Sequence, residues 1–226
     1  MARSGKGDPY AGKSTWGKIW YFVWDDDSVL SWIVNVILAF VIIKFLLYPG
    51  LGLLLQTGHP VVAVVSSSMN HHVLDEGGGY GLCGQDFDES QRLSFMEYWD
   101  VCGAWYESRN ITSEDFDDFP FASGFSRGDI MVLYGTDPGD IQVGDVIVFR
   151  NRRNVPIIHR VVEKGLQQGE LRFVTKGDHN PQPIRSLELD EYGVSAQQYI
   201  GRAVFRIPLL GYVKVWASQL WSLVVS

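Results

Sequence analysis

The chain has 226 residues, 46% of them hydrophobic and 20% charged, which is enough for one folded domain with appendages. Its formal net charge is -7, from 19 lysine and arginine residues against 26 aspartate and glutamate residues. A nucleic-acid-binding protein needs a basic face, and the basic cluster at Arg150, Arg152 and Arg153 is too small to provide one. We therefore expect no nucleic-acid partner.

The first 27 residues are rich in glycine and show no sustained hydrophobic period. Aromatic rings crowd the end of this segment at Trp16, Trp20, Tyr21, Phe22 and Trp24. We expect residues 1–27 to form a mostly loose tail. Its rings would lie at the level of the lipid headgroups, where amphipathic aromatic side chains are favoured.

Residues 28–48 are apolar apart from two serines, Asn35 and Lys44. At a rise of 1.5 Å per residue, a helix of this length matches a hydrocarbon core of about 30 Å. The following Pro49-Gly50 is expected to kink or stop it, so we predict a transmembrane anchor over 28–50. The apolar run exceeds the roughly 7–15 residues of a removable signal peptide, which favours a permanent anchor.

Positive charge flanks the expected anchor on one side only. Four lysine and arginine residues precede it, and none occurs from residue 45 until Arg92. The positive-inside rule places the N-terminus in the cytoplasm and residues 58–226 outside the cell membrane, or in a secretory lumen. On that oxidising side we predict a disulfide between Cys83 and Cys102. Asn110 begins an N-glycosylation sequon on the same side.

From Arg127 onward, short runs rich in valine, isoleucine and phenylalanine alternate with turns that contain glycine. Such runs favour strands joined by hairpins. The expected strands cover residues 129–134, 145–150, 157–163, 170–176 and 199–206, with 61–65 as the first strand. They predict a mainly antiparallel β domain. Residues 213–226 are too short and interrupted for a second span, so we expect them at the membrane interface or packed on the sheet.

Residues 75–126 differ from the sequence on either side and predict a small helical cap inserted into the β domain. Within 90–108, apolar side chains recur at the spacing of one helical face, at Leu93, Met96, Trp99, Cys102 and Tyr106. Thr112, with an acidic residue three positions later, marks the start of a second short helix. We expect the aromatic face to pack on the β domain.

Three kinds of side chain that together form a serine-nucleophile site occur at the edges of the expected strands. Ser66 to Ser68 follow the first strand, His159 lies within a later one, and Asp178 follows the next. A serine becomes a nucleophile when a base removes its proton, and a third group fixes the tautomer of the base. Spacing alone does not decide between this site and ordinary structural roles, since serines after a strand commonly form a turn.

Four motifs, S-X-S-M, G-D-V-I-V-F, I-H-R-V-V and T-K-G-D-X-N, follow one N-terminal membrane helix in this order. Together they resemble type I signal peptidases over roughly residues 28–70 and 127–215. Histidine before Arg-Val-Val is similar to the archaeal and endoplasmic-reticulum branch, which uses serine and histidine. The resemblance implies a coiled antiparallel β fold and a membrane-bound serine endopeptidase that needs no cofactor or metal. Its partners would be signal-peptide-bearing preproteins, the lipid bilayer and the protein translocation machinery.

The resemblance also implies a role for each motif residue. Ser68, directly before Met69, matches the nucleophile, and His159 matches the general base. Ser66 matches the serine that holds the oxyanion together with the backbone N–H of Ser68. Asp178 matches the aspartate that orients the histidine or supports the site.

Two positions depart from the family pattern. Proline usually stands two residues after the methionine, where this chain has His71. A second aspartate usually follows the Gly-Asp pair by six residues, where this chain has Ile184. Asp190 is therefore an alternative to Asp178 as the partner of the histidine.

Two other classes of function remain open at this stage. A metal-dependent hydrolase would draw its ligands from His71, His72, His159, His179 and Asp178, although adjacent histidines fit the usual spacing of zinc ligands poorly. A membrane-anchored β domain without activity would instead recruit a partner through its helical cap.

Overall fold

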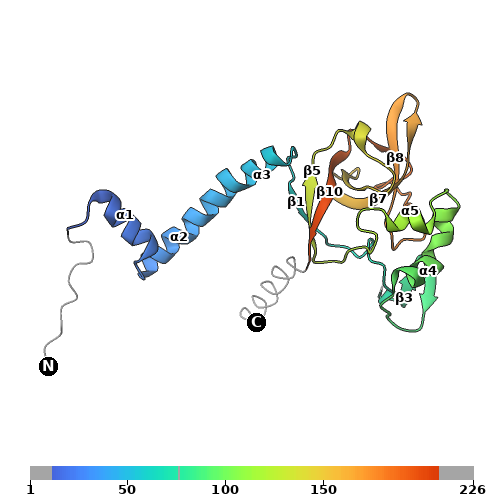
Figure 1. Cartoon of the computed structure of the whole chain (residues 1–226), viewed down its shortest axis with the longest axis horizontal. Coiled ribbons are helices and arrows are strands. Elements are labelled where there is room, and N and C mark those ends of the chain that lie inside the picture. The colour runs from blue at the N-terminus through green and yellow to red at the C-terminus, as the bar shows by residue number, and fades with distance from the viewer. Residues whose placement is uncertain (1–11, 76, 209–226) are drawn as a thin grey trace. The chain divides into compact units, whose positions relative to one another are not determined.

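The chain divides into two compact units, Met1–Leu51 and Gly52–Ser226. The computed structural model describes residues 12–75 and 77–208 of them (Figure 1). The tail at 213–226, expected at the interface or on the sheet, lies outside the described residues.

The described part of the first unit is helical, and its last helix continues past Leu51. Helix α1 spans Thr15–Trp24, α2 spans Val29–Ile42, a π-helical turn spans Ile43–Leu47, and α3 spans Tyr48–Leu54. The expectation of a loose tail is wrong for α1. The side chain of Ser14 accepts a hydrogen bond from the backbone N–H of Gly17, and this cap starts the helix despite the glycines around it.

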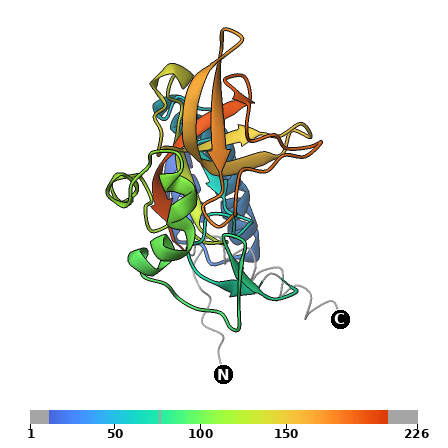
Figure 2. The same ribbon diagram turned by 90° about the vertical axis from the view of Figure 1, so that its right-hand side faces the viewer.

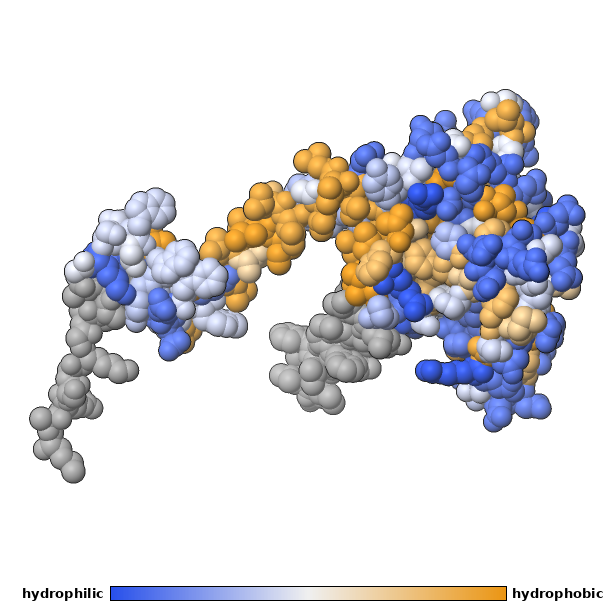
Figure 3. All heavy atoms as spheres, viewed as in Figure 1, coloured by the Kyte–Doolittle hydropathy of each residue, from blue (hydrophilic) through white to orange (hydrophobic). Residues whose placement is uncertain are grey.

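Helices α2 and α3 and the turn between them make one apolar helix, Val29–Leu54, of 26 residues. It is long and apolar enough to cross a membrane, and its surface is almost wholly hydrophobic (Figure 3). The helix continues through Pro49-Gly50, so of the expected kink or stop there, the stop is wrong. The π-helical turn ends just before Pro49, and the N–H of Tyr48 donates to the carbonyl of Ile43. Such local widening is one way in which membrane helices accommodate proline.

The second unit is built on a seven-stranded sheet with the order β1-β5-β10-β6-β7-β8-β9, in which every neighbouring pair is antiparallel. The strands are β1 (Val61–Ala63), β5 (Ile130–Tyr134), β6 (Val146–Arg150), β7 (Pro156–Gln167), β8 (Glu170–Lys176), β9 (Val194–Ser195) and β10 (Tyr199–Ile207). The predicted mainly antiparallel β domain is confirmed. Strand β9 was not expected, and a short 3₁₀ turn, η2, spans Pro138–Asp140.

Strand β6 lies at the centre of the sheet and is buried on both faces. Val146 and Val148 point into one apolar cluster, while Ile147 and Phe149 point into another. Successive side chains of a strand face opposite sides, so this continuous apolar run fills two cores at once. Strand β6 pairs along its length with β7.

The strands and helices between β1 and β5 lie beside the large sheet (Figures 1 and 2). It contains a three-stranded antiparallel sheet of β2 (Leu74–Asp75), β3 (Tyr80–Leu82) and β4 (Gln85–Phe87), followed by α4 (Phe95–Glu107) and α5 (Ser113–Asp117). The helical part agrees with the predicted cap, whereas the small sheet was not expected. A disulfide joins Cys83, between β3 and β4, to Cys102 of α4.

Both cap helices begin with a capping box, at Ser94 for α4 and at Thr112 for α5. The predicted start of the second helix is therefore confirmed. The predicted face of the first is partly wrong, because Met96 is 61% exposed and Tyr98 is fully buried. Since α4 starts only at Phe95, its first turn points Met96 to solvent and Tyr98 inward.

Candidate active site

Ser68 lies in the segment that leaves β1 and turns into the core. The turn is closed by a hydrogen bond from the N–H of Asn70 to the carbonyl of Ser67. Met69 is 1% exposed, and its sulfur accepts a hydrogen bond of 3.4 Å from the N–H of Asp178. The carbonyl of Ser68 accepts from the N–H of His179 at 2.9 Å. The nucleophile candidate is thus fixed from both sides by the loop after β8.

His159 lies in β7 opposite Ile147 of β6 and is 4% exposed. Its Nε2 lies 2.9 Å from the Oγ of Ser68, although the two residues are 91 positions apart in the chain. This is hydrogen-bond distance between a base and a hydroxyl. The structure therefore brings together the two residues that the motifs paired.

Glu191 contacts the other ring nitrogen of this histidine, with Oε1 2.5 Å from Nδ1 of His159. The carboxylate has no exposed surface, and it also accepts from Thr175 Oγ1 at 2.9 Å and from the N–H of Ile184 at 2.8 Å. When Nδ1–H donates to the carboxylate, the lone pair of Nε2 faces Ser68. Ser68, His159 and Glu191 thus have the connectivity of a catalytic triad.

Neither aspartate that the sequence offered as the partner of His159 contacts it. Asp190 is 40% exposed and lies 3.6 Å from Arg185, while Asp178 is fully buried among other partners. Sequence reasoning missed Glu191 because it adjoins Asp190 in an acidic stretch, and the carboxylate of either residue could be the partner of His159. Only burial separates these neighbours, since one turns outward and the other inward.

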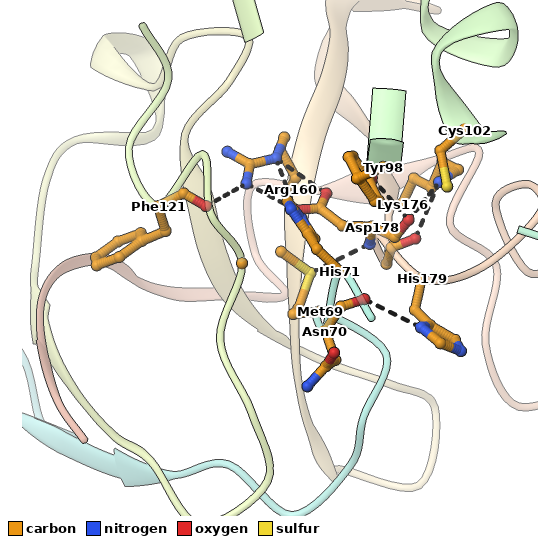
Figure 4. Close-up of polar contacts among 12 residues, drawn as sticks. Met69, Asn70, His71, Tyr98, Cys102, Phe121, Arg160, Lys176, Asp178 and His179 are labelled. Carbon is orange, nitrogen blue, oxygen red and sulfur yellow. Dashed lines mark hydrogen bonds and ion pairs between the residues drawn. The ribbon is translucent and has the colours of Figure 1, made fainter. Parts of the chain in front are cut away.

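Asp178 is the centre of a buried ionic cluster (Figure 4). Arg160 donates to it from Nη2 at 2.7 Å and from Nε at 3.0 Å, and both side chains have no exposed surface. The hydroxyl of Tyr106 and Nε2 of His71 complete the contacts, at 3.1 and 2.9 Å. Burial alone would raise the pKa of Asp178. The charge of Arg160 and the hydrogen bonds from His71 and Arg160 outweigh it and hold the pKa below its usual range.

The same cluster connects the cap to the large sheet. Tyr106 and Tyr98 belong to α4, and the hydroxyl of Tyr98 donates to the carbonyl of Asp178. His71, at the position where the family pattern has proline, stacks on Tyr98 at 3.8 Å between ring centroids. This departure therefore accompanies the insertion, because a histidine can bridge Asp178 and the cap whereas proline cannot.

Lys176 is buried beside the cluster and is 1% exposed. Its ammonium donates to the carbonyls of Gly177 and Asp178 at 3.1 and 3.2 Å, and to the hydroxyl of Tyr106 at 3.3 Å. Burial lowers the pKa of Lys176 to about 7, against the opposing effect of Asp178. The Lys-Gly-Asp motif is therefore mostly a structural support behind the loop that holds Ser68.

A cleft of about 320 Å³ opens beside Ser68 and His159. Apolar side chains form most of its wall, namely Val62, Ala63, Val65, Val148, Val155, Pro156, Ile157, Ile158, Ile184 and Leu189. The remaining lining residues are Ser66, Ser68, His159 and Asn180. The Oγ atoms of Ser66 and Ser68 lie 3.1 Å apart, so the expected oxyanion serine is next to the nucleophile candidate.

Two strand edges border this cleft. Strand β1 is at the end of the sheet order and pairs only with β5 among the described strands. In β7, Pro156 to His159 pair with β6, whereas the pairing with β8 starts at Arg160. An extended peptide could therefore form backbone hydrogen bonds along the cleft by strand addition.

The other histidines do not gather around a common point. His71 contacts Asp178, and His179 Nδ1 lies 3.0 Å from the carbonyl of Asn70. Among the described residues, no group of three or more histidine, cysteine or acidic side chains is arranged to hold a metal ion. Asn110 of the sequon is exposed in the turn after α4.

No protein-family model matches the chain, but curated proteins do. The signal peptidase complex catalytic subunit SEC11 of Colletotrichum graminicola is 35% identical over 98 residues, or 42% of this chain and 57% of that protein. Proteins of the same name from Saccharomyces cerevisiae strains YJM789 and RM11-1a are 33% identical over 99 residues, or 42% of this chain and 59% of theirs. The chain thus spans less than two thirds of the length of these relatives.

The mainly antiparallel β domain, the small helices and the apolar N-terminal helix are consistent with a signal-peptidase-like fold. The resemblance predicted from the four motifs is confirmed over the matched part of the chain. Its homologues there are named signal peptidase complex catalytic subunits.

Proposed function

We propose that the chain is a membrane-bound serine endopeptidase that removes signal peptides from exported preproteins. The observation that carries the proposal is the contact of 2.9 Å between Ser68 Oγ and His159 Nε2 at one end of an apolar cleft. The homology to signal peptidase catalytic subunits supports the substrate class. In a signal peptide, an apolar segment is followed by small residues at the cleavage site, which suits a cleft with an apolar wall.

In this mechanism, His159 Nε2 takes the proton of Ser68 as Oγ attacks the carbonyl carbon of the scissile bond. The backbone N–H of Ser68 and the hydroxyl of Ser66 donate to the resulting oxyanion. The imidazolium then gives its proton to the leaving amine, and the mature protein departs. Water, deprotonated by the same nitrogen, hydrolyses the acyl-enzyme and regenerates Ser68.

Glu191 supports both steps through His159. Its carboxylate keeps the proton on Nδ1 and stabilises the positive charge that the imidazole gains in each transition state. It acts as a positioning residue, because it contacts His159 rather than the substrate. In this proposal it takes the place that the sequence offered to Asp178 or Asp190.

The apolar helix Val29–Leu54 would anchor the enzyme with its N-terminus in the cytoplasm and residues 58–226 on the far side of the membrane. The catalytic domain would then meet the preprotein as it emerges from the translocation machinery. Protease added to sealed vesicles whose non-cytoplasmic face is outward should digest the β domain. Protection of that domain would overturn the orientation.

The direct test is cleavage of a preprotein by the purified full-length chain in detergent. Ser68→Ala and His159→Ala should each lower kcat by roughly 10⁴-fold or more, and the double variant should lose no more than either single one. Ser67→Ala is the matched control, because the Ser67 side chain lines a different groove and should leave cleavage unchanged. Full activity of Ser68→Ala would refute the serine mechanism.

The same assay decides between the other two classes of function. Cleavage that persists with a chelator such as EDTA would exclude a metal-dependent hydrolase. A wild-type protein that binds preprotein but releases no product would favour the non-catalytic recruiting domain.

A further inference from the structure

Asn180 carries a buried polar atom that the fold does not satisfy. In the described part of the chain, four buried side-chain polar atoms have no hydrogen-bond partner, and they are Asn35 Oδ1, Thr136 Oγ1, Arg172 Nε and Asn180 Nδ2. Of these residues, only Asn180 lines the cleft that contains Ser68 and His159. A buried donor without an acceptor destabilises a fold, so this one calls for an acceptor from outside the chain.

The position of the amide is set by a tight turn. The N–H of Asn180 donates to the carbonyl of Gly177 at 2.9 Å. A Cβ atom on Gly177 would lie 2.7 Å from Asn180 Nδ2, 2.8 Å from the carbonyl oxygen of Ser68 and 2.9 Å from His159 Nε2. These three atoms therefore surround one point, and the unsatisfied donor lies near the ring nitrogen of His159 that contacts Ser68. Glycine at 177 leaves the space that this convergence needs.

The chemistry of the cleft limits what Asn180 can bind. Its wall is mostly apolar, and its other polar side chains are Ser66, Ser68 and His159, which the mechanism already uses. A site of this kind orients its ligand with a few placed polar groups. An extended peptide that lies along β1 and β7 brings a row of main-chain carbonyls, each of which is an acceptor.

We propose that Asn180 is a substrate-binding residue whose side-chain N–H₂ donates to a main-chain carbonyl of the preprotein segment in the cleft. The inference rests on the proposed function and extends it. Because the carbonyl belongs to the backbone, the contact recognises an extended peptide and not a particular side chain. It complements the apolar wall, which selects small apolar residues.

The test compares Asn180→Ala, Asn180→Asp and Ser67→Ala in the full-length protein, with a synthetic peptide that spans a signal-peptide cleavage site as the probe. Asn180→Ala should lower kcat/KM roughly 3- to 10-fold, mainly through a higher KM, as expected for one neutral hydrogen bond. Asn180→Asp should lower it further, because a carboxylate puts an acceptor opposite the carbonyl. Ser67→Ala should match the wild-type protein.

The stability of the Asn180→Ala variant provides a second readout, because a purely structural role of Asn180 would make this variant less stable than the wild-type protein. Because Nδ2 has no partner within the described fold, Asn180→Ala should leave the midpoint of urea unfolding unchanged or raise it. A lower midpoint, or a kcat/KM within twofold of wild type, would overturn the binding role. If the wild-type protein cleaves and Ser68→Ala does not, such a result refutes the role of Asn180 alone. A wild-type protein that cleaves nothing would overturn both proposals.

Discussion

The substitution Glu191→Gln isolates the contact that completes the site. It keeps the size and shape of the side chain but replaces one carboxylate oxygen with an N–H₂ group. Oε1 lies 2.5 Å from His159 Nδ1 and 2.9 Å from Thr175 Oγ1, and Oε2 accepts from the N–H of Ile184. All three neighbours act as donors to the carboxylate. A glutamine has one oxygen for them and loses the negative charge.

The magnitude follows from what the carboxylate does for the histidine. Without it, the tautomer with its proton on Nε2 becomes competitive, and that nitrogen then cannot accept the proton of Ser68. The transition-state imidazolium also loses its buried counter-ion. In a serine–histidine–aspartate site the corresponding change costs about 10⁴ in kcat. We expect a loss on the order of 10³- to 10⁴-fold in kcat with little change in KM.

The assay is steady-state cleavage of the signal-peptide substrate, with urea unfolding to show that each variant is folded. Asp190→Asn is the matched control, because Asp190 is the adjacent acid but points outward to Arg185. It should stay within twofold of the wild-type protein, since exposed ion pairs contribute only about 0–1 kcal/mol. A folded Glu191→Gln variant with kcat within tenfold of wild type would refute the role of Glu191. Loss of activity in Asp190→Asn would instead assign the role of positioning His159 to Asp190.

Three further predictions concern the structure that holds the site. Asp178→Asn should lower the free energy of unfolding by about 3–5 kcal/mol, because it leaves Arg160 buried without its counter-ion. Since the pKa of Asp178 is lowered in the fold, urea titrations should show this difference above pH about 4. The difference should be lost in more acidic solution. Because the pKa of Lys176 is lowered to about 7 in the fold, the unfolded chain binds more protons than the folded chain between about pH 7 and pH 10. The free energy of unfolding should therefore rise between pH 7 and 9, by at most about 3 kcal/mol. A Lys176→Met variant whose free energy of unfolding rises equally with pH would contradict this. Replacing Cys83 and Cys102 with serine should lower the free energy of unfolding by about 3 kcal/mol, and mass spectrometry of the unreduced wild-type protein should find the linked peptides; free thiols there would disprove the bond.

Much of the fold could be predicted because its signals are local. Short apolar runs separated by turns that contain glycine located six strands of the large sheet. The capping residue Thr112 located the start of α5. The errors occurred at single positions within helices that the pattern otherwise located. Pro49 lies inside a helix that a π-helical turn accommodates, and Met96 follows the helical spacing but faces solvent.

The residues of the site were predictable to different degrees. Ser68 and His159 belong to short motifs, and the resemblance of those motifs to a known family paired the two residues. Glu191 could not be chosen over Asp190 or Asp178, because all three are carboxylates that follow the expected strand 170–176 and residue type does not separate them. The choice depends on the loop after β8, which departs from the family pattern at Ile184.

The sequence by itself determined the apolar helix and the β class of the domain, because both follow from residue type and spacing along the chain. It indicated the serine–histidine pair through the resemblance of its four motifs to a known family. Only the tertiary structure decided which carboxylate meets His159. It also showed that Asp178 supports the cap through Arg160 and Tyr106, and that Asn180 has an unsatisfied donor in the cleft. The physical reason is that burial and hydrogen-bond geometry depend on segments far apart in the chain. Adjacent residues such as Asp190 and Glu191 can then have opposite environments.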